Sequence, residues 1–248
     1  MVETEVLFAI IPQAKTMENI EQGKPGGTLL DHSINTVYAL ETIDLLKITR
    51  EEELLGWLQR YINKNYSVLK LSAFLHDIGK PPCYIEKNGE VHFYGHEKKG
   101  VEILRTLREW IRWSNKEMKL MENLILNHMR PHLLAGNGEP TEHAIGRLIR
   151  QVGDDIPGLL LLSYADGIAS GGEWIHVLAS FLRRVLRMYN ETKKPKFKRL
   201  INGYDLINLG LTPGPIFKTI LQEVEELQIS GRLKTKDEAV EYVKRKYL

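Results

Sequence analysis

Apolar side chains recur at helical spacing along most of the chain, and this pattern predicts a protein built mainly from α-helices. The expected helices cover residues 28–46, 51–62, 67–79, 95–113, 114–129, 141–152, 155–169, 173–190 and 215–229, with a short terminal helix that begins at 235. At Ser114 and Thr235 a capping-box pattern marks a helix start, because a glutamate follows three residues later. Pro131 is expected to end the 114–129 helix, since the residue before a proline is disfavoured in the helical conformation.

Residues 83–95, CYIEKNGEVHFYG, depart from the helical pattern. Asn88-Gly89 lies between two short strand-like runs, which is typical of a type I′ hairpin turn. The segment ETKKPKFKR, residues 191–199, is basic, contains a proline and has few apolar positions. We therefore expect an all-α fold with one small β-hairpin, divided into a main domain over residues 1–192 and a C-terminal helical appendage over residues 193–248.

Composition places the chain among ordinary globular proteins. Of its 248 residues 43% are apolar and 27% are charged, and the 34 Lys and Arg against 32 Asp and Glu give a net charge of +2. This balance gives no whole-chain signature of a polyanion partner, and one cysteine excludes a disulfide framework or a Cys-rich zinc site. No apolar run is long enough for a membrane span, and the start MVETEVLFAIIPQ lacks the pattern of a signal peptide. We expect a cytoplasmic protein without a membrane partner.

Several groups that commonly bind metals lie at apolar helix positions. His76 and Asp77 end the apolar run VLKLSAFL, where an unpaired imidazole and carboxylate would be unfavourable to bury. His32 and His128 each lie on an apolar helix face, and Asp166 follows the run LLLLSYA. Taken singly, an inward histidine is more often a hydrogen-bonded core residue, and such an aspartate is more often a cap or an ion-pair partner. Taken together, without enough buried basic partners, they favour a divalent ion such as Mn²⁺, Fe²⁺, Co²⁺, Ni²⁺ or Zn²⁺.

The order His, His-Asp, His, His, Asp on successive helices resembles the HD superfamily of metal-dependent phosphohydrolases. The resemblance implies an HD-domain helical bundle that binds one or two divalent transition-metal ions. The implied ligands of the core metal are His32, His76, Asp77 and Asp166. The segments GHEKKG and NHMRP are similar to the extra motifs of two-metal members, which implies that His96 and His128 bind a second ion and that Asp77 bridges the two.

A closer resemblance, to the HD region of bacterial tRNA nucleotidyltransferases (the CCA-adding and poly(A) polymerase family), extends along most of the chain. The segments that carry it are LLDHSINTV, FLHDIGKP, GHEKKGVEIL, LREWIRWSNKE, LILNHMRPH and LLLLSYADG, and INGYDLINLGLTPGPIFKTILQEV with GRLKTKDEAVEYV resembles the C-terminal end of the same enzymes. Members with an active HD region hydrolyse 2′,3′-cyclic nucleotides, 2′-nucleotides and other phosphate esters. Residues 1–28 show no counterpart of the nucleotidyltransferase head, so we expect that this chain alone does not add nucleotides.

The candidate catalytic residues are Asp77, Lys80 and Arg130. Lys80 follows the helix end closely and could reach a phosphate oxygen, or it could stabilise the helix macrodipole. Arg130 offers a planar fork for phosphate, with an ordinary surface arginine as the alternative. His132 lies one turn beyond His128 but across a proline, so it is either a substrate contact or a solvent-exposed side chain.

Three functional hypotheses remain open. The leading one is a metal-dependent phosphohydrolase that acts on nucleotides or RNA 3′ ends through metal-activated hydroxide. The second is a non-catalytic RNA-binding or partner subunit that complements a separate nucleotidyltransferase chain. The third is an HD enzyme for other nucleotides, such as deoxynucleoside triphosphates or dinucleoside polyphosphates. Arginines within 147–150 and 183–187 hint at tRNA contact, although such charge runs are more often solvated faces.

Overall fold

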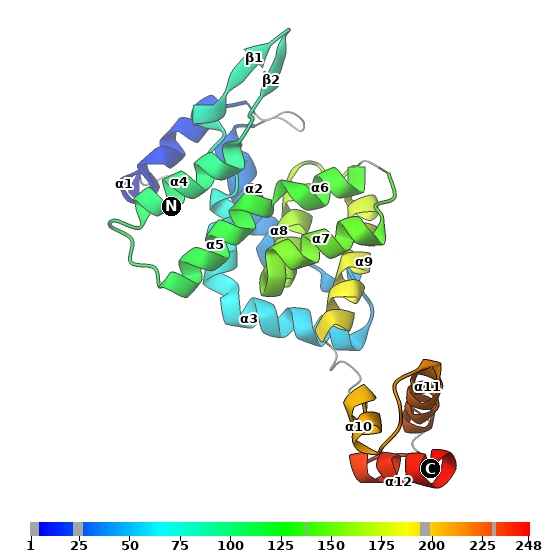
Figure 1. Ribbon diagram of the computed structural model, residues 1–248. Helices are drawn as coiled ribbons and strands as arrows, with labels where there is room; N and C mark the ends of the chain where they lie inside the picture. Colours follow the sequence, from blue (N-terminus) through cyan, green and yellow to red (C-terminus); the bar gives the residue numbers. More distant parts are fainter. Residues whose placement is uncertain (1–4, 22–26, 137, 194–198, 230–231) are drawn as a thin grey trace. The chain divides into compact units, whose positions relative to one another are not determined.

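The computed structural model describes residues 5–21, 27–136, 138–193, 199–229 and 232–248. The chain divides into two compact units, Met1–Lys193 and Lys194–Leu248. The helices are α1 (Val6–Ile10), α2 (Leu29–Glu41), α3 (Glu52–Leu75), α4 (His96–Leu107), α5 (Asn115–Asn127), α6 (Met129–Gly136), α7 (Glu142–Val152), α8 (Ile156–Ala169), α9 (Ile175–Lys193), α10 (Gly203–Asn208), α11 (Pro215–Ile229) and α12 (Lys236–Tyr247) (Figure 1). Short 3₁₀ helices occur at Pro12–Asn19, Leu45–Lys47, Pro81–Cys83 and Gly153–Asp155.

The two strands form one hairpin. Strand β1 (Ile85–Lys87) pairs antiparallel with β2 (Glu90–His92), with Lys87 opposite Glu90. Asn88 and Gly89 both have positive φ, 56° and 77°, as a type I′ turn requires. The predicted hairpin and the all-α class are therefore confirmed.

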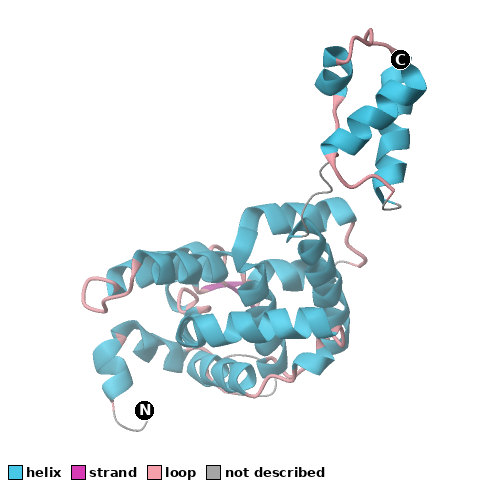
Figure 2. Ribbon diagram, turned by 90° about the horizontal axis from the view of Figure 1, so that it is seen from below, coloured by secondary structure: helices cyan, strands magenta, loops and turns pink. Residues whose placement is uncertain are grey.

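Helix α8 lies at the centre of the first unit. Its residues from Ile156 to Asp166 are all buried, and it packs against α2, α3, α5, α6 and α9. This is expected for a helix that is apolar all round, and Figure 2 shows how far helices dominate the first unit. Asp166 is the last residue of the continuously buried part of this helix.

Helix α3 spans the two helices that the sequence predicts. They meet at a kink within the predicted break at residues 63–66, where Asn65 has non-helical backbone angles, φ −121° and ψ 17°. The Asn65 side-chain amide donates to the Tyr61 carbonyl at 3.0 Å, so this carbonyl stays paired and the helix continues past the kink. Ser67, expected to cap a second helix, lies inside α3 instead. The C-terminal half of α3 ends directly at His76.

The predicted stop before Pro131 is confirmed, but a further helix that the sequence did not predict follows at once. Helix α5 ends at Asn127, His128 keeps helical backbone angles, and α6 begins at Met129 and passes through Pro131. Proline has no N–H to donate to the Asn127 carbonyl, which explains an interruption at His128. Proline is nevertheless tolerated in the first turn of a new helix, where no intrahelical donor is needed. The chain therefore continues helically through His132.

The second unit has its own small core, formed by Ile201, Leu206, Ile220, Val224, Ala239 and Val243. Thr235 and Glu238 form the predicted capping box at the start of α12. Of the predicted basic connector, residues 194–198 lie outside the described residues. Among the described residues, no helix combines the length and apolar character needed to cross a membrane.

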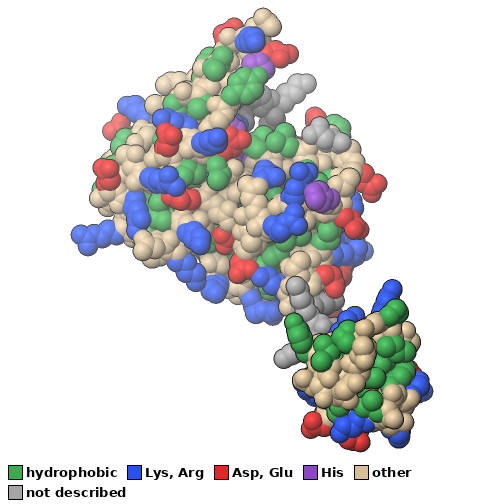
Figure 3. Space-filling model, in the orientation of Figure 1, with side chains coloured by type: hydrophobic (Ala, Val, Ile, Leu, Met, Phe, Trp, Pro, Cys, Tyr) green, Lys and Arg blue, Asp and Glu red, His purple; other side chains and the backbone are tan. Residues whose placement is uncertain are grey.

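The arginines of α9 bind groups of the protein itself. Arg183 Nε donates to the Ile48 carbonyl at 2.8 Å, and Arg187 forms an ion pair with Glu51. On the face shown in Figure 3, the Lys and Arg side chains of the first unit are interspersed with Asp and Glu. These contacts explain the 183–187 arginines as structural residues of the helical bundle.

Candidate metal centre

The fold brings together all six predicted metal ligands. Their positions are His32 in α2, His76 and Asp77 directly after α3, His96 at the start of α4, His128 between α5 and α6, and Asp166 in α8. All six are buried. Five of them form two groups that share Asp77, one with His32 and His76 and the other with His96 and His128. The sixth, Asp166, lies beside His32 in the first group.

The second group is a nearly equilateral triangle of acceptor atoms. His96 Nε2 and His128 Nε2 are 3.3 Å apart, and Asp77 Oδ1 lies 3.4 Å from the first and 3.3 Å from the second. Bonds of ~2.0–2.1 Å at tetrahedral angles place neighbouring ligand atoms roughly 3.3–3.4 Å apart. The spacing of the three atoms therefore fits a divalent ion bound by all three.

Hydrogen bonding fixes which ring nitrogens carry protons. The Nδ1 atoms of His96 and His128 lie 2.8 and 2.7 Å from the carbonyl oxygens of Phe93 and Ile125. A carbonyl oxygen only accepts, so Nδ1 donates in both rings, and the Nε2 atoms of the neutral rings bear lone pairs. Asp77 Oδ1 is buried without a hydrogen-bond donor. Three atoms with free lone pairs therefore lie close together, and no hydrogen-bond donor lies between them. A bound cation would stabilise this arrangement.

The first group offers four atoms that could bind a metal ion. His32 Nε2 and His76 Nε2 are 3.3 Å apart, and His76 Nε2 lies 3.2 Å from Asp77 Oδ2. Asp166 Oδ1 lies 3.1 Å from His32 Nε2 and 3.8 Å from His76 Nε2. His76 Nδ1 donates to the Ala73 carbonyl at 2.8 Å, so its Nε2 is also free to bind an ion when the ring is neutral.

The two carboxylates are held in their ionised form. Burial alone would raise the pKa of Asp77, but the nearby His76 and Lys80 hold it well below its usual range. Burial likewise acts to raise the pKa of Asp166, but hydrogen bonds from His132 and His32 hold it well below the usual range. Burial lowers the pKa of His96, which favours the neutral ring that binds a metal.

The candidate catalytic residues are placed differently. Lys80 Nζ lies 2.7 Å from Asp77 Oδ2, with its side chain 12% exposed, so it reaches the centre. Arg130 lies in the first turn of α6, is half-buried, and is not among the described residues that line the adjoining cavity. The structure therefore places Lys80, but not Arg130, among the described residues that line this cavity.

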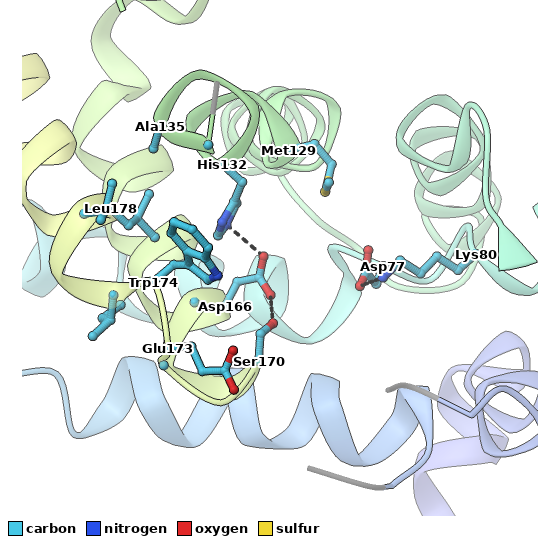
Figure 4. Close-up of a pocket in the computed structure, with 15 residues that line it drawn as sticks. Asp77, Lys80, Met129, His132, Ala135, Asp166, Ser170, Glu173, Trp174 and Leu178 are labelled. Carbon is cyan, nitrogen blue, oxygen red and sulfur yellow. Dashed lines mark hydrogen bonds and ion pairs between the residues drawn. The ribbon is translucent and has the colours of Figure 1, made fainter. Parts of the chain in front are cut away.

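His132 belongs to the site, although the sequence left its role open. Its Nε2 lies 3.0 Å from Asp166 Oδ2 in an ion-pair contact (Figure 4). The other oxygen, Asp166 Oδ1, lies 3.1 Å from His32 Nε2, so Asp166 lies between the two imidazoles. The signal was the i, i+4 spacing from His128, but the intervening Pro131 made a shared helical course look unfavourable.

An open cavity of about 450 Å³ adjoins the centre. Asp77 and Lys80 lie at one end of it, and Trp174 and Leu178 lie toward the other (Figure 4). Asp166 contributes to its wall. A volume of this size is in the range of small-molecule sites, so a ligand can reach both carboxylates from solvent.

Two relatives share recognisable sequence with this chain. The CC-adding tRNA nucleotidyltransferase of Thermus thermophilus is 30% identical over 176 residues, which cover 68% of this chain and 38% of that enzyme. The A-adding tRNA nucleotidyltransferase of Deinococcus radiodurans is 27% identical over 186 residues, which cover 72% of this chain and 41% of that enzyme. The chain thus spans about two fifths of the length of these relatives.

A family model described as HD domain matches residues 29–171. This range contains all six converging side chains and Lys80. It covers more than half of the chain. Within it the six converging side chains follow one another in the order His, His-Asp, His, His, Asp. By this match, the chain belongs to the HD domain family.

Proposed function

We propose that the protein is a metal-dependent phosphohydrolase that cleaves phosphate esters of nucleotides, such as 2′,3′-cyclic or 2′-nucleotides, or RNA 3′ ends. The observation that carries the proposal is the convergence of unprotonated imidazole nitrogens on both oxygens of Asp77. HD domains bind divalent metals, and the two groups of side chains fit such ions in chemistry and in spacing. Imidazole and carboxylate donors suit Mn²⁺, Fe²⁺, Co²⁺, Ni²⁺ or Zn²⁺.

The proposed ligands of one ion are His32, His76, Asp77 and Asp166, and those of a second are Asp77, His96 and His128. A divalent ion supplies a lowered pKa for bound water and neutralises phosphoryl oxygens. The chain's own residues hold the ligands in place through hydrogen bonds from ring Nδ1 atoms to backbone carbonyls. These carbonyls make the arrangement rigid before a substrate arrives.

Lys80 and His132 support the reaction from either side of the carboxylates. The Lys80 ammonium, next to Asp77 at the cavity, can move to a non-bridging phosphate oxygen and offset its charge. His132 contacts Asp166 Oδ2 in an ion pair, and the other carboxylate oxygen lies toward His32. Arg130 remains a candidate phosphate contact only if a bound substrate extends beyond the cavity to the first turn of α6.

A metal-by-substrate panel tests this function. Protein stripped with chelator and reloaded singly with Mn²⁺, Co²⁺, Ni²⁺ or Zn²⁺ should hydrolyse a chromogenic phosphodiester or a 2′,3′-cyclic nucleotide. The Asp77→Ala variant should lose this activity, whereas His143→Ala, which removes an exposed helical histidine, should retain it. Protein that is inert with every metal on a broad phosphoester panel would contradict the proposal.

The two relatives also support a second candidate function, which is non-catalytic binding of tRNA. Both relatives are tRNA nucleotidyltransferases by name, so we propose tRNA as a candidate ligand and a separate nucleotidyltransferase chain as a candidate partner. A cytoplasmic location fits these ligands. If the metal-loaded protein does not hydrolyse phosphoesters but shifts tRNA in a gel, the non-catalytic binding function is supported and the hydrolase function is contradicted.

A further inference from the structure

The cavity beside the metal centre has two chemically different ends. Lys80 is the one Lys or Arg among the described residues that line it, and it lies with Asp77 at one end (Figure 4). The other end is walled by Trp174 and Leu178, with Asp166 between the two ends. A ligand therefore fits best with its anionic group near Lys80 and an uncharged, apolar part against the indole.

Trp174 is unusually exposed for an indole. Its relative exposure is 71%, against 46% for Trp110, and the side chains of Trp57 and Trp113 are half-buried. An indole normally contributes most when it is buried, so core packing does not explain this position. Its place at the mouth of a cavity indicates a surface that a flat ligand covers.

The turn before α9 fixes the position of Trp174. Gly171 and Gly172 have φ of 100° and 71°, angles that other residues rarely adopt, and the Gly172 N–H donates to the Gly167 carbonyl at 3.1 Å. The Trp174 carbonyl in turn accepts from the Leu178 N–H at 3.0 Å. The backbone that carries the indole is therefore hydrogen-bonded on both sides of Trp174.

Gly167 lets helix α9 pack closely against α8 beside the cavity. A Cβ atom built on it would lie 2.9 Å from Leu178 Cδ2 and 3.2 Å from Ile175 Cδ1, both on residues that line the cavity. A larger residue directly after Asp166 would therefore displace these side chains and change the cavity wall next to Trp174.

We propose that this cavity is a nucleobase subsite in which Trp174 is the stacking surface, an inference that rests on the phosphohydrolase function proposed above. The phosphate of the substrate lies at the Lys80 end, and its base lies on the indole. Glu173 also lines the cavity, so an anionic group is disfavoured beside the indole and the phosphate is placed at the Lys80 end. The substrate class is a nucleoside that carries a phosphate ester. Aromatic stacking suits every base, so Trp174 selects for a base without selecting among bases.

A binding experiment without metal separates this inference from hydrolysis. Adenosine, titrated to millimolar concentration in the presence of chelator, should quench part of the tryptophan fluorescence of the full chain. The quenching should disappear in Trp174→Phe and persist in Trp110→Phe, which removes the next most exposed indole. Equal quenching in wild type and Trp174→Phe, or none in the wild type, would overturn the subsite.

A kinetic comparison adds a second, independent readout. For the metal-loaded enzyme, kcat/KM is measured on adenosine 2′,3′-cyclic phosphate and on glycerol 1,2-cyclic phosphate, which has no base. Trp174→Ala should lower the ratio of the two values about tenfold or more, and Trp174→Phe should restore part of it. An unchanged ratio in an active enzyme overturns the subsite but leaves the hydrolase intact. If the protein is inert on phosphate esters but adenosine still quenches its fluorescence through Trp174, the hydrolase proposal is overturned and the subsite is kept.

Discussion

The backbone of Gly79 lies directly against the backbone of His96. A Cβ atom built on Gly79 would lie 2.1 Å from the His96 carbonyl oxygen and 2.5 Å from the Gly100 nitrogen. Gly79 follows the end of α3 just after Asp77, and His96 begins α4. This close approach brings the His96 ring within reach of the Asp77 carboxylate, so a residue without a side chain at 79 is a condition for the second group of ligands.

Gly79→Ala should destabilise the protein by about 3 kcal/mol, since the added methyl group meets backbone atoms that cannot rotate away. It should also displace His96 from Asp77 and weaken metal binding. The matched control is Gly56→Ala in α3, whose Cβ would meet only the flexible end of Arg60 and which should stabilise by about 0.4–1 kcal/mol. Thermal melts and metal analysis of both variants check this, and equal stability of the two would contradict it.

Asp77→Asn keeps the shape of the side chain but removes the charge that both histidine pairs share. Its two oxygens face different pairs, so we expect both ions to be lost and kcat/KM to fall by more than about 100-fold, the loss that supporting residues alone can cause. Metal content by mass spectrometry and circular dichroism of the same sample separate this from unfolding. Retention of both ions by a folded variant would show that Asp77 does not bridge them.

His132→Ala should remove the ion-pair contact of Asp166 Oδ2 and free the carboxylate to rotate. We expect the affinity for the ion bound by His32 and His76 to fall about 10–100-fold with the fold intact. Titration with Mn²⁺ against a competing chelator measures this, with His176→Ala, an exposed histidine of α9, as the control. Unchanged affinity would mean that His132 acts only on the substrate, or not at all.

Glu223 joins α11 to α12 through Lys246, Tyr242 and Tyr247. Hydrogen bonds from Lys246, Tyr242 and Tyr247 lower the pKa of Glu223 from 4.5 to about 2. The folded state binds this proton more weakly than the unfolded state, so the stabilisation is present above pH 4.5 and is lost as pH falls toward 2.

Amide exchange of α11 and α12 should therefore accelerate between pH 4.5 and 2 beyond its intrinsic pH dependence. Glu223→Gln should remove most of that change, and Glu226→Gln, at an exposed position of the same helix, should not. The same pH dependence in wild type and Glu223→Gln would show that this carboxylate does not hold the two helices together.

The sequence predicted most of the helices and the hairpin because these depend on local patterns. Thr141, for example, precedes the helix Glu142–Val152, and Asn88-Gly89 selects one type of turn. The order of His and Asp residues within apolar helices, together with the resemblance that it carries, then picked out six side chains. Their convergence on Asp77 depends on how the helices pack, which no local sequence pattern specifies.

The errors share one physical cause. A residue expected to end a helix is followed by further helix, because the backbone hydrogen bond that it affects is replaced or is not needed. Asn65 pairs its side chain with the Tyr61 carbonyl, so α3 bends where an end was predicted. Pro131 falls in a first turn that needs no donor, so the chain continues and places His132 on Asp166. Gly79, expected as a helix stop, is also needed for close approach to another segment, a requirement visible only in the fold.

The central claim is that two divalent ions lie on either side of Asp77. A crystal of the Mn²⁺-loaded protein, measured for anomalous scattering of manganese, tests it most directly. The account predicts one peak between Asp77 Oδ2, His32, His76 and Asp166, and a second between Asp77 Oδ1, His96 and His128. Manganese-loaded crystals with no anomalous peak at either position, or with peaks only elsewhere on the protein, would contradict it.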